Sequence, residues 1–344
     1  MHKKNTAAVL EKFNSKLRFY DFKINNLEKG QVLVKILYSG ICKSQIMEIE
    51  GNRDTKKWLP HMLGHEAVGK VLDYHKNNKK FKKGDEVIAT WINSKGIKSL
   101  GGNVKIKNKK INYGPITTFS KYALISENKL IKKPNYLNNI YAPFFGCAAL
   151  TGMGMVYNQT KPKRNHIILL VGLGGIGFFS VLALLEKGIK KIIVIDINEN
   201  KRKLAQDLGI KYFFNINKFN EKKKLVDCFS KKIDLCYENS GNSKSIEFCL
   251  SMIKDKGKVI FSSHPPKKNK IKIDPHELIK GKKIIGTWGG NCKPDRDVLR
   301  FSKIFLKNKT ILNHIKSNIY KFNQINNAIN DFKKGKVLRP IIKF

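Results

Sequence analysis

The sequence contains no run of about 18 or more consecutive apolar residues, so no segment is expected to cross a membrane as a helix. The basic N-terminal stretch, residues 1–16, has only AAVL as an apolar run and is not expected to act as a signal peptide. Cysteine is scarce, with six in 344 residues and no Cys-x-x-Cys spacing. This excludes a disulfide framework and favours a cytoplasmic protein whose thiols are metal ligands or core residues.

Acidic residues are also scarce: 26 Asp and Glu stand against 68 Lys and Arg, which gives a net charge of +42. Such a charge could indicate a protein that binds nucleic acid or an anionic surface. However, the basic residues form short scattered clusters, with neither an aromatic RNA-binding signature nor a basic recognition helix. Lys, Ile and Asn are abundant throughout, as an AT-rich genome would produce. Either way, the positive field favours anionic ligands at low salt.

The pattern of the sequence changes near residue 147. Before it, short β-rich segments predict strands at 31–40, 66–75, 84–92 and 119–134, with a polar loop at 93–113. After it, strands alternate with helical patterns, as in a doubly wound parallel sheet, with the strands expected at 166–171, 190–196, 211–216, 233–239, 257–263 and 282–288. One helix (297–308) and a short tail follow. The length and the alternation predict an α/β protein of two domains.

A glycine-rich turn follows the first strand of the second half. Gly172, Gly174 and Gly177 form G-x-G-x-x-G between an apolar strand and a helix, with Gly175 inside the turn. The next strand ends in Asp196, 19 residues after Gly177. This context indicates a dinucleotide site, in which the helix N-terminus faces the pyrophosphate and the carboxylate binds the adenosine ribose. A carboxylate there repels a 2′-phosphate, so NAD is expected rather than NADP. The alternative is a glycine turn without a ligand.

Two cysteines and a histidine in the first half form a candidate metal set. Cys42 follows a strand, His65 stands in Gly-His-Glu, and Cys147 lies where the pattern of the sequence changes. Two thiolates and an imidazole suit Zn²⁺ and leave one position open for a substrate oxygen. Spacing alone leaves open that these cysteines are simply buried.

Several motifs occur in the order found in zinc-containing alcohol dehydrogenases of the medium-chain dehydrogenase/reductase superfamily, which the chain resembles nearly end to end. They are SGICKSQ (39–45), PHMLGHEAVGKV (60–71), FKKGDEVIA (81–89), FGCAALTGMGMV (145–156), VGLGGIGFFSVLAL (171–184), VIDINENKRKLAQDLG (194–209) and KKGKVLRPIIKF (333–344). The resemblance implies a GroES-like β-barrel catalytic domain built from both chain ends, 1–148 and 289–344. It implies a Rossmann domain between them, at 149–288.

The resemblance also implies roles for residues of the first half. Cys42, His65 and Cys147 match the ligands of the catalytic zinc. Glu66 matches a carboxylate beside the metal, and Ser44 matches the hydroxyl that bonds the substrate alcohol and begins the proton path.

Further matches concern the cofactor. Lys43 and Arg339 match basic residues that contact the pyrophosphate, and Thr151 matches a residue packed near the nicotinamide ring. Asp196 and Lys201 match the contacts to the adenosine ribose.

Trp91 falls where the family places an aromatic wall of the substrate pocket, although ordinary core packing also accounts for a tryptophan there.

Three positions depart from the family pattern. Residues 92–116 contain no cysteine, so one catalytic zinc and no structural zinc are expected. Gln45 replaces the acidic residue that usually orients the metal-bound histidine; it can accept a hydrogen bond but adds no charge. Met47 stands where some relatives carry a histidine that ends the proton relay.

The expected reaction is NAD-dependent oxidation of an alcohol to a carbonyl compound, or its reverse. The substrate is not readable, although the positive charge suggests an anionic polyol or sugar derivative. Two alternatives stay open: a zinc-free medium-chain reductase of an activated double bond, and a non-enzymatic role in nucleic-acid binding. A homodimer or homotetramer is expected, with residues 282–288 as the candidate edge strand for association.

Overall fold

The computed structural model describes residues 4–24, 26–53, 55–106, 108–307 and 319–344. The chain forms two compact units. Unit 1 comprises Met1–Cys147, Lys293–Ser302 and Lys316–Phe344, and unit 2 comprises Ala148–Cys292 and Lys303–Ile315. The domain limits inferred from the sequence, 149 and 288, stay a prediction.

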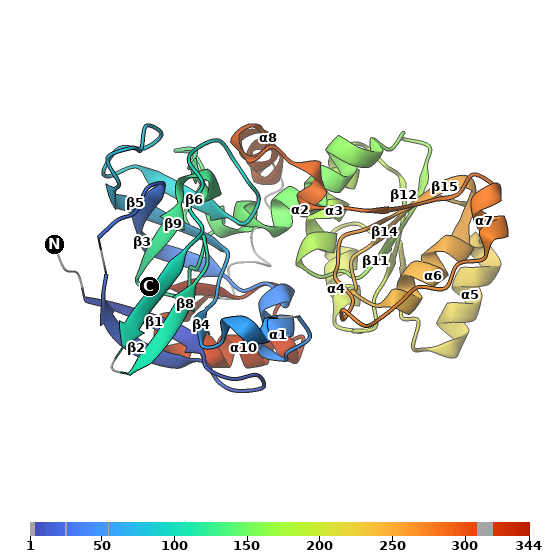
Figure 1. Ribbon diagram of the computed structural model, residues 1–344. Coiled ribbons are helices and arrows are strands. Elements are labelled where there is room, and N and C mark those ends of the chain that lie inside the picture. Colours follow the sequence, from blue (N-terminus) through green and yellow to red (C-terminus); the bar gives the residue numbers. More distant parts are fainter. Residues whose placement is uncertain (1–3, 25, 54, 107, 308–318) are drawn as a thin grey trace. The chain divides into compact units, whose positions relative to one another are not determined.

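Unit 1 is built mainly from antiparallel strands. One sheet has the order β2-β1-β4-β8-β7, and a second has the order β10-β6-β5-β3-β18-β17 with β9 also paired to β3 (Figure 1). The strands are β1 (Lys4–Leu10), β2 (Arg18–Lys23), β3 (Gln31–Gly40), β4 (His61–Met62), β5 (Glu66–Tyr74), β6 (Glu86–Thr90), β7 (Gly102–Ile106), β8 (Lys109–Tyr113), β9 (Tyr122–Ser126), β10 (Leu130–Lys132), β17 (Ile319–Lys321) and β18 (Ile341–Lys343).

The helices of unit 1 are few. They are α1 (Lys43–Ile49), α10 (Ile325–Lys333) and the helical turns η1 (Lys56–Trp58), η2 (Glu127–Lys129), η3 (Ala142–Gly146) and η6 (Phe322–Gln324). Helix α8 (Pro294–Leu306) begins in unit 1, and its last residues group with unit 2.

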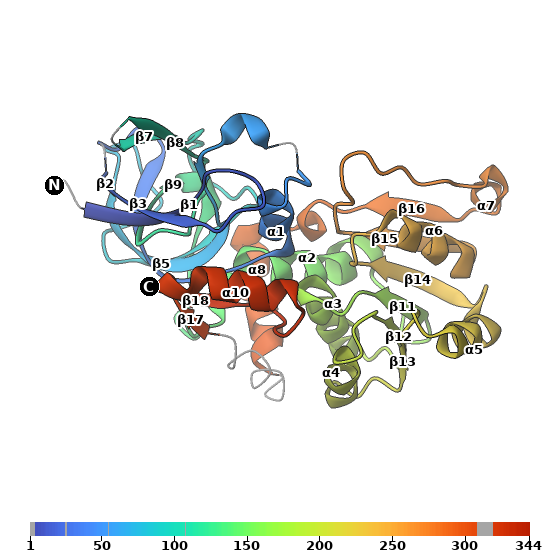
Figure 2. The ribbon, with the colours of Figure 1, turned by 90° about the horizontal axis from the view of Figure 1, so that it is seen from below.

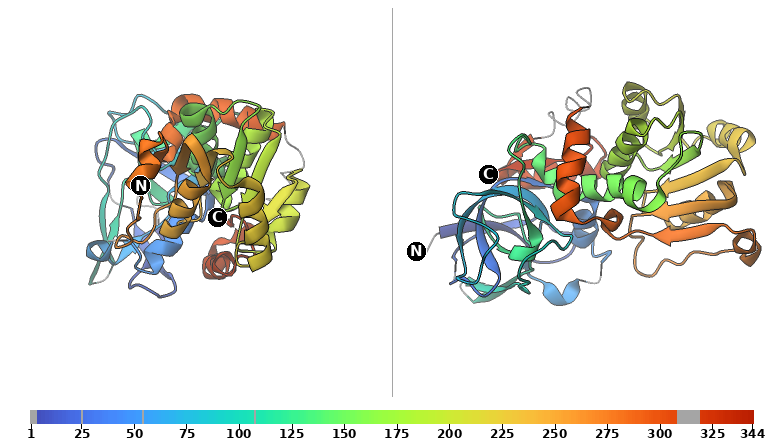
Figure 3. Two further views of the ribbon diagram at one scale, coloured as in Figure 1. Left: turned by 90° about the vertical axis from the view of Figure 1, so that its right-hand side faces the viewer. Right: turned by 90° about the horizontal axis from the view of Figure 1, so that it is seen from above.

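Segments from both ends of the chain complete unit 1. Strand β18 pairs antiparallel with β3, with Ile341 opposite Gly40 (Figure 2). Helix α10 buries Ile325 and Ile329 in a cluster that also holds Leu10 and Ile46, so red C-terminal and blue N-terminal segments share one core (Figures 2 and 3). This arrangement agrees with a catalytic domain built from both chain ends.

Two sequence expectations for unit 1 are wrong. The polar loop expected at 93–113 contains the β7–β8 hairpin, whose buried Val104 and Ile111 alternate with Lys and Asn on the solvent face. A strand with one solvated face needs only alternate apolar residues, and the lysine-rich background hides that pattern. The expected short tail contains α10 and β18.

Unit 2 contains a six-stranded parallel sheet with the order β13-β12-β11-β14-β15-β16. The two strands at its centre, Ile167–Val171 and Lys191–Ile195, are nearly continuous apolar runs, as burial on both faces requires, whereas the strand Ile253–Phe261 carries exposed Lys and Asp residues near its start. The strands of this sheet are β11 (Ile167–Val171), β12 (Lys191–Ile195), β13 (Tyr212–Phe214), β14 (Ile233–Glu238), β15 (Ile253–Phe261) and β16 (Lys283–Gly286).

Helices connect these strands. They are α2 (Ala148–Gly154), η4 (Met155–Thr160), α3 (Gly175–Glu186), α4 (Lys201–Asp207), α5 (Phe219–Phe229), α6 (Ser243–Met252), α7 (Pro275–Ile279) and η5 (Gly289–Asn291). The strand order reverses between β11 and β14, and such a switch point is where doubly wound sheets bind ligands at the carboxyl ends of their strands. The predicted α/β fold class, with a doubly wound parallel sheet, is confirmed.

Among the described residues, no helix is both long and apolar enough to span a membrane.

Candidate active site and dinucleotide site

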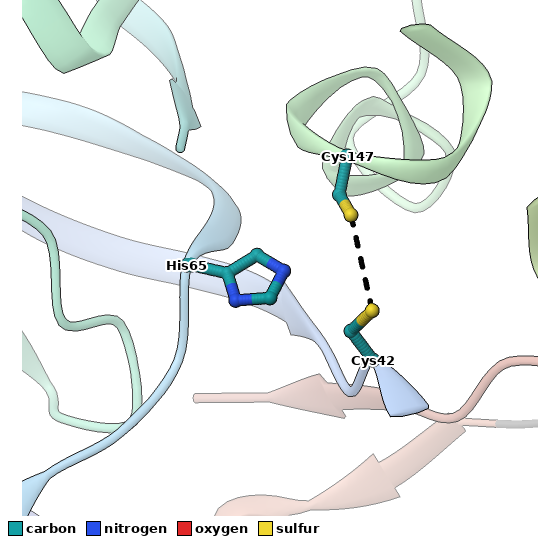
Figure 4. Close-up of side chains that lie close together, drawn as sticks. All are labelled: Cys42, His65 and Cys147. Atoms are coloured by element: carbon teal, nitrogen blue, oxygen red, sulfur yellow. Dashed lines mark hydrogen bonds between the residues drawn. The ribbon is translucent and has the colours of Figure 1, made fainter. Parts of the chain in front are cut away.

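Cys42, His65 and Cys147 converge in unit 1 (Figure 4). Cys42 precedes α1, His65 lies between β4 and β5, and Cys147 follows η3. One ligand atom from each residue lies within 4.8 Å of the others, and the two sulfur atoms are 3.9 Å apart. The two cysteines are buried and His65 is half-buried. Residues far apart in the sequence therefore present three metal-binding atoms to one point.

A glycine lies one or two residues before each of these three residues, and the surrounding atoms explain why. Gly64 has a φ of +94°, and a Cβ there would lie 2.4 Å from Thr118 Oγ1. A Cβ on Gly40 would lie 2.4 Å from Glu66 Oε1, and one on Gly146 would lie 2.3 Å from the carbonyl oxygen of Ala89. The segments that carry the ligands can approach one another only because these positions have no side chain.

The two thiols influence each other strongly. The hydrogen bond with Cys147 lowers the pKa of Cys42 well below its usual value, helped by the charge of Arg339. The same contact and burial raise the pKa of Cys147 well above its usual value. The two shifts have opposite directions, so of the two sulfurs Cys42 is the one that more readily loses its proton. Both sulfurs become ligands only as thiolates, so metal binding at this site is coupled to pH.

Beneath the ligands lies a buried ion pair. The guanidinium of Arg339 donates to Glu66 Oε2 at 2.6 Å, and both side chains are buried. Burial raises the pKa of Glu66, whereas Arg339 opposes that shift. The charge of Arg339 also stabilises the Cys42 thiolate. Arg339 is thus engaged inside unit 1, and its expected contact with a pyrophosphate stays a prediction.

Gln45 joins two of the candidate ligands. Its Oε1 accepts the backbone N–H of Cys42 at 2.7 Å, and its Nε2 contacts Nδ1 of His65. Within the described chain, the Nε2 of His65 is buried without a hydrogen-bond partner, so it can serve as the ligand atom. In the orientation present here the amide donates to His65. From its chemistry Gln45 can also accept a hydrogen bond from the histidine, which would need the amide rotated so that its oxygen faces the ring.

The other unit 1 site residues differ in exposure. The hydroxyl of Ser44 is buried and has no hydrogen-bond partner in the described part of the chain, so it is available to a substrate. Lys43 is exposed at the start of α1. Trp91 is half-buried just after β6, and its carbonyl oxygen accepts from Lys129. These positions leave the expected roles of all three residues as predictions.

In unit 2 the glycine turn joins β11 to α3. Gly172 has a φ of +88°, and a Cβ on Gly177 would lie 2.1 Å from the carbonyl oxygen of Gly172. A Cβ on Gly174 would meet nothing within 4 Å, because this position faces open space at the N-terminus of α3. Gly172 and Gly177 are thus glycines for steric reasons, whereas the space beside Gly174 is open and its predicted contact with a pyrophosphate stays a prediction.

Asp196 follows β12 beside this turn. Its Oδ2 accepts the backbone N–H of Leu173 at 2.8 Å, and its Oδ1 accepts that of Asn198 at 2.9 Å. Lys201 opens α4, where burial lowers its pKa and the charge of Asp196 raises it. Thr151 is buried in α2. The carboxylate therefore shapes the turn in addition to its expected contact with a ribose.

One residue of unit 2 was missed by the sequence analysis. Glu238 ends β14 at the switch point and is completely buried. Its carboxylate accepts hydrogen bonds from Ser240 and Ser263. A carboxylate at the end of an otherwise apolar strand is visible in the sequence, but its partners are not.

Comparison with known proteins agrees with this geometry. Residues 28–135 match the family model described as alcohol dehydrogenase GroES-like domain, and residues 175–307 match the model described as zinc-binding dehydrogenase. Together the two models cover more than half of the chain. The chain belongs to the zinc-containing, medium-chain alcohol dehydrogenases. It is an oxidoreductase of that family, which uses zinc and NAD, and the predicted family and enzyme class are confirmed.

Individual relatives span the full length of the chain. S-(hydroxymethyl)glutathione dehydrogenase of Escherichia coli O1:K1 / APEC is 25% identical over 369 residues, covering 99% of this chain and 100% of that protein. The crystal structure of benzyl alcohol dehydrogenase from Acinetobacter calcoaceticus superposes with a TM-score of 0.87 at 22% identity, covering 99% of both chains. An alcohol dehydrogenase zinc-binding domain protein from Burkholderia ambifaria gives 0.87 at 22% identity and covers both chains entirely.

Two variants of the glycine turn distinguish an effect on packing from an effect on NADH binding. Gly177→Ala forces the helix away from the turn, so both the thermal midpoint and the affinity for NADH should fall. Gly174→Ala should leave the midpoint unchanged and weaken NADH about tenfold or more, because its Cβ enters only the ligand space. Differential scanning calorimetry and NADH fluorescence titration check both. Equal effects of the two variants on stability would contradict this assignment.

Proposed function

We propose that this protein interconverts an alcohol and its carbonyl compound with NAD(H), using one zinc ion held by Cys42, His65 and Cys147. The convergence of three ligand atoms within 4.8 Å in unit 1 carries the proposal. These residues fit zinc because the set combines two sulfurs with an imidazole nitrogen that has no hydrogen-bond partner among the described residues. Bound zinc supplies Lewis acidity toward the substrate oxygen. A zinc-free reductase would have no need of this set.

The residues around the set support the same chemistry. Two thiolates balance a divalent cation, so the loaded site is nearly neutral and tolerates a negatively charged substrate oxygen. The unpartnered hydroxyl of Ser44 can accept the proton of the alcohol while passing its own onward. The charges of Glu66 and Arg339 neutralise each other next to the site, and their ion pair holds the two segments that carry them together. With Met47 at the usual relay position, the next proton acceptor after Ser44 is a group outside this set.

For the cofactor we propose NAD in preference to NADP, because the Asp196 carboxylate lies beside the turn that would hold the adenosine half. The cysteine-free segment 92–116 supports a single zinc per chain. A homodimer or homotetramer associating through residues 282–288 and a cytoplasmic location remain predictions from the sequence.

The substrate class is proposed more broadly, as an alcohol or carbonyl compound, with a polyol or sugar derivative first. The E. coli relative is named for S-(hydroxymethyl)glutathione and the Acinetobacter structure for benzyl alcohol, and these substrates differ greatly in size and charge. The net charge of +42 favours anionic candidates among them. A nucleic-acid-binding role ranks below the zinc-free reductase as an alternative, and it would show salt-dependent binding that is insensitive to the metal ligands.

A screen of neutral and phosphorylated polyols, benzylic alcohols and S-(hydroxymethyl)glutathione tests this function. NADH formation is followed by absorbance in the zinc-loaded protein. We expect turnover with at least one alcohol and none after removal of zinc by a chelator. Unchanged turnover after complete removal of zinc would favour the zinc-free reductase.

Substitution of the metal ligands should remove zinc without affecting the nucleotide site. Cys42→Ser and His65→Ala are expected to lower bound zinc from one per chain to near zero and to abolish hydride transfer, because the substrate oxygen loses its Lewis acid. NADH binding should survive, since the glycine turn lies in unit 2. Elemental analysis and NADH titration on the same samples measure both. Cys228→Ser, which alters an exposed thiol, is the matched control; two zincs per chain in the wild type would contradict the proposal.

Removing the charge of Asp196 should reduce the preference for NAD. Asp196→Asn keeps an oxygen for the N–H of Leu173 but no longer repels a 2′-phosphate, so the ratio of NADP to NAD dissociation constants should fall roughly tenfold. Asp196→Ala should reduce the ratio similarly while weakening both dinucleotides, because the turn loses its acceptor as well. Isothermal titration measures the constants. Equal binding of NAD and NADP by the wild type would refute this role.

A further inference from the structure

Glu238 occupies an unusual environment for a carboxylate. It ends β14 with no exposed surface, and no lysine or arginine contact compensates its charge in the hydrogen bonds of the described chain. Instead it accepts from the backbone N–H of Ser240 at 2.7 Å, from the Ser240 hydroxyl, and from the Ser263 hydroxyl at 2.9 Å. Burial raises its pKa, and these donors oppose the shift. Burying a carboxylate costs free energy, and removing this one would leave its buried donors without their acceptor.

The groups that Glu238 holds belong to two loops at the carboxyl end of the sheet. One loop, 239–241, joins β14 to α6, and the other begins at 262 after β15. They are joined further by the Ser262 hydroxyl, which donates to Asn239 Oδ1 at 2.6 Å, and by the Ser262 N–H, which donates to the Glu238 carbonyl at 3.0 Å. We call residues 239–241 and 262–263 the Glu238 platform.

The platform touches the glycine turn directly. The N–H of Asn239 donates to the carbonyl of Val171 at 2.8 Å. A Cβ on Gly172 would lie 2.9 Å from the nitrogen of Ser240. The position of Ser240, which Glu238 fixes, therefore sets the side of the turn that faces β14, opposite the side that faces β12 and Asp196.

The strand order places the two halves of a dinucleotide. The adenosine ribose is expected at Asp196, after β12, and the pyrophosphate at the N-terminus of α3, after β11. In the sheet, β14 lies on the other side of β11 from β12, and β15 follows β14. The second half of the dinucleotide, which carries the nicotinamide, must then extend over the ends of these two strands, where the platform lies.

We propose that Glu238 is a positioning residue for the nicotinamide half of the dinucleotide, acting through the platform it holds beneath that half. The proposal rests on the NAD-dependent function above and concerns unit 2 alone. The two carboxylates beside the turn would then act differently. Asp196 would contact the adenosine half directly, whereas Glu238 is buried and would act only through the backbone and hydroxyl groups that it holds.

The test compares NADH with adenosine 5′-monophosphate, which contains only the adenosine half, in the full-length protein. Glu238→Ala should weaken NADH about tenfold or more, as expected when buried donors lose their acceptor, and should change the AMP dissociation constant by less than about twofold. Glu238→Gln, which keeps one acceptor oxygen, should restore most of the NADH affinity. Glu247→Ala is the matched control. The half-buried carboxylate of Glu247 also accepts a hydrogen bond from the backbone of a loop, namely from the N–H of Lys272 at 2.8 Å.

Ser263→Ala provides a second variant if Glu238→Ala does not fold, since it removes one platform contact and leaves the carboxylate in place. We expect it to weaken NADH by about two- to fivefold and to leave AMP unaffected. Equal weakening of NADH and AMP would show general loosening of unit 2 and overturn the proposal, as would unchanged NADH binding. A wild-type protein that binds AMP but not NADH would instead refute the cofactor assignment, so the two failures are distinguishable.

Discussion

The buried ion pair between Glu66 and Arg339 is the interaction on which the catalytic unit depends. It joins residues separated by 273 positions and lies next to the thiolate of Cys42. Removing one partner from such a pair leaves an uncompensated buried charge, which costs roughly 3–5 kcal/mol. The same pair requires glycine at positions 40 and 146, because Glu66 fills the space that a side chain there would take. The ion pair and the glycines around it therefore determine together how closely the segments that carry the candidate ligands approach one another.

The same arrangement occurs at both sites. In each case a carboxylate lies next to a glycine and is bound to backbone N–H groups or to a cation. Glu66 lies against Gly40, Asp196 accepts from the residue after Gly172, and Glu238 holds Ser240 against Gly172. A glycine removes the steric barrier to close approach, and the carboxylate then fixes the approach in one geometry. Hydrogen-bonded carboxylates of this kind order loops that have few apolar contacts of their own.

The sequence predicts the elements whose physics is local. The central strands of unit 2, β11 and β12, are apolar runs, and the glycine turn needs only Gly172, Gly174 and Gly177 in their context. The convergence of Cys42 with Cys147 could be expected only through the family resemblance, because no local pattern brings residues so far apart together. The partner of Arg339, the orientation of the Gln45 amide and the network of Glu238 depend on side chains that meet only in the folded chain. The β7–β8 hairpin was missed because lysines mask its alternation.

The pairing of β18 with β3 has a consequence for synthesis on the ribosome. Unit 2 is nearly complete when residue 292 has emerged, whereas the last residues of β3, Tyr38–Gly40, must wait for β18 before their edge away from β5 is paired. The nucleotide unit can therefore fold first during translation, and the segment before Cys42 stays open until the end of the chain is released. Zinc loading would then be a late, post-translational event, and a nascent chain stalled before residue 339 would carry unprotected thiols without the arginine that stabilises them.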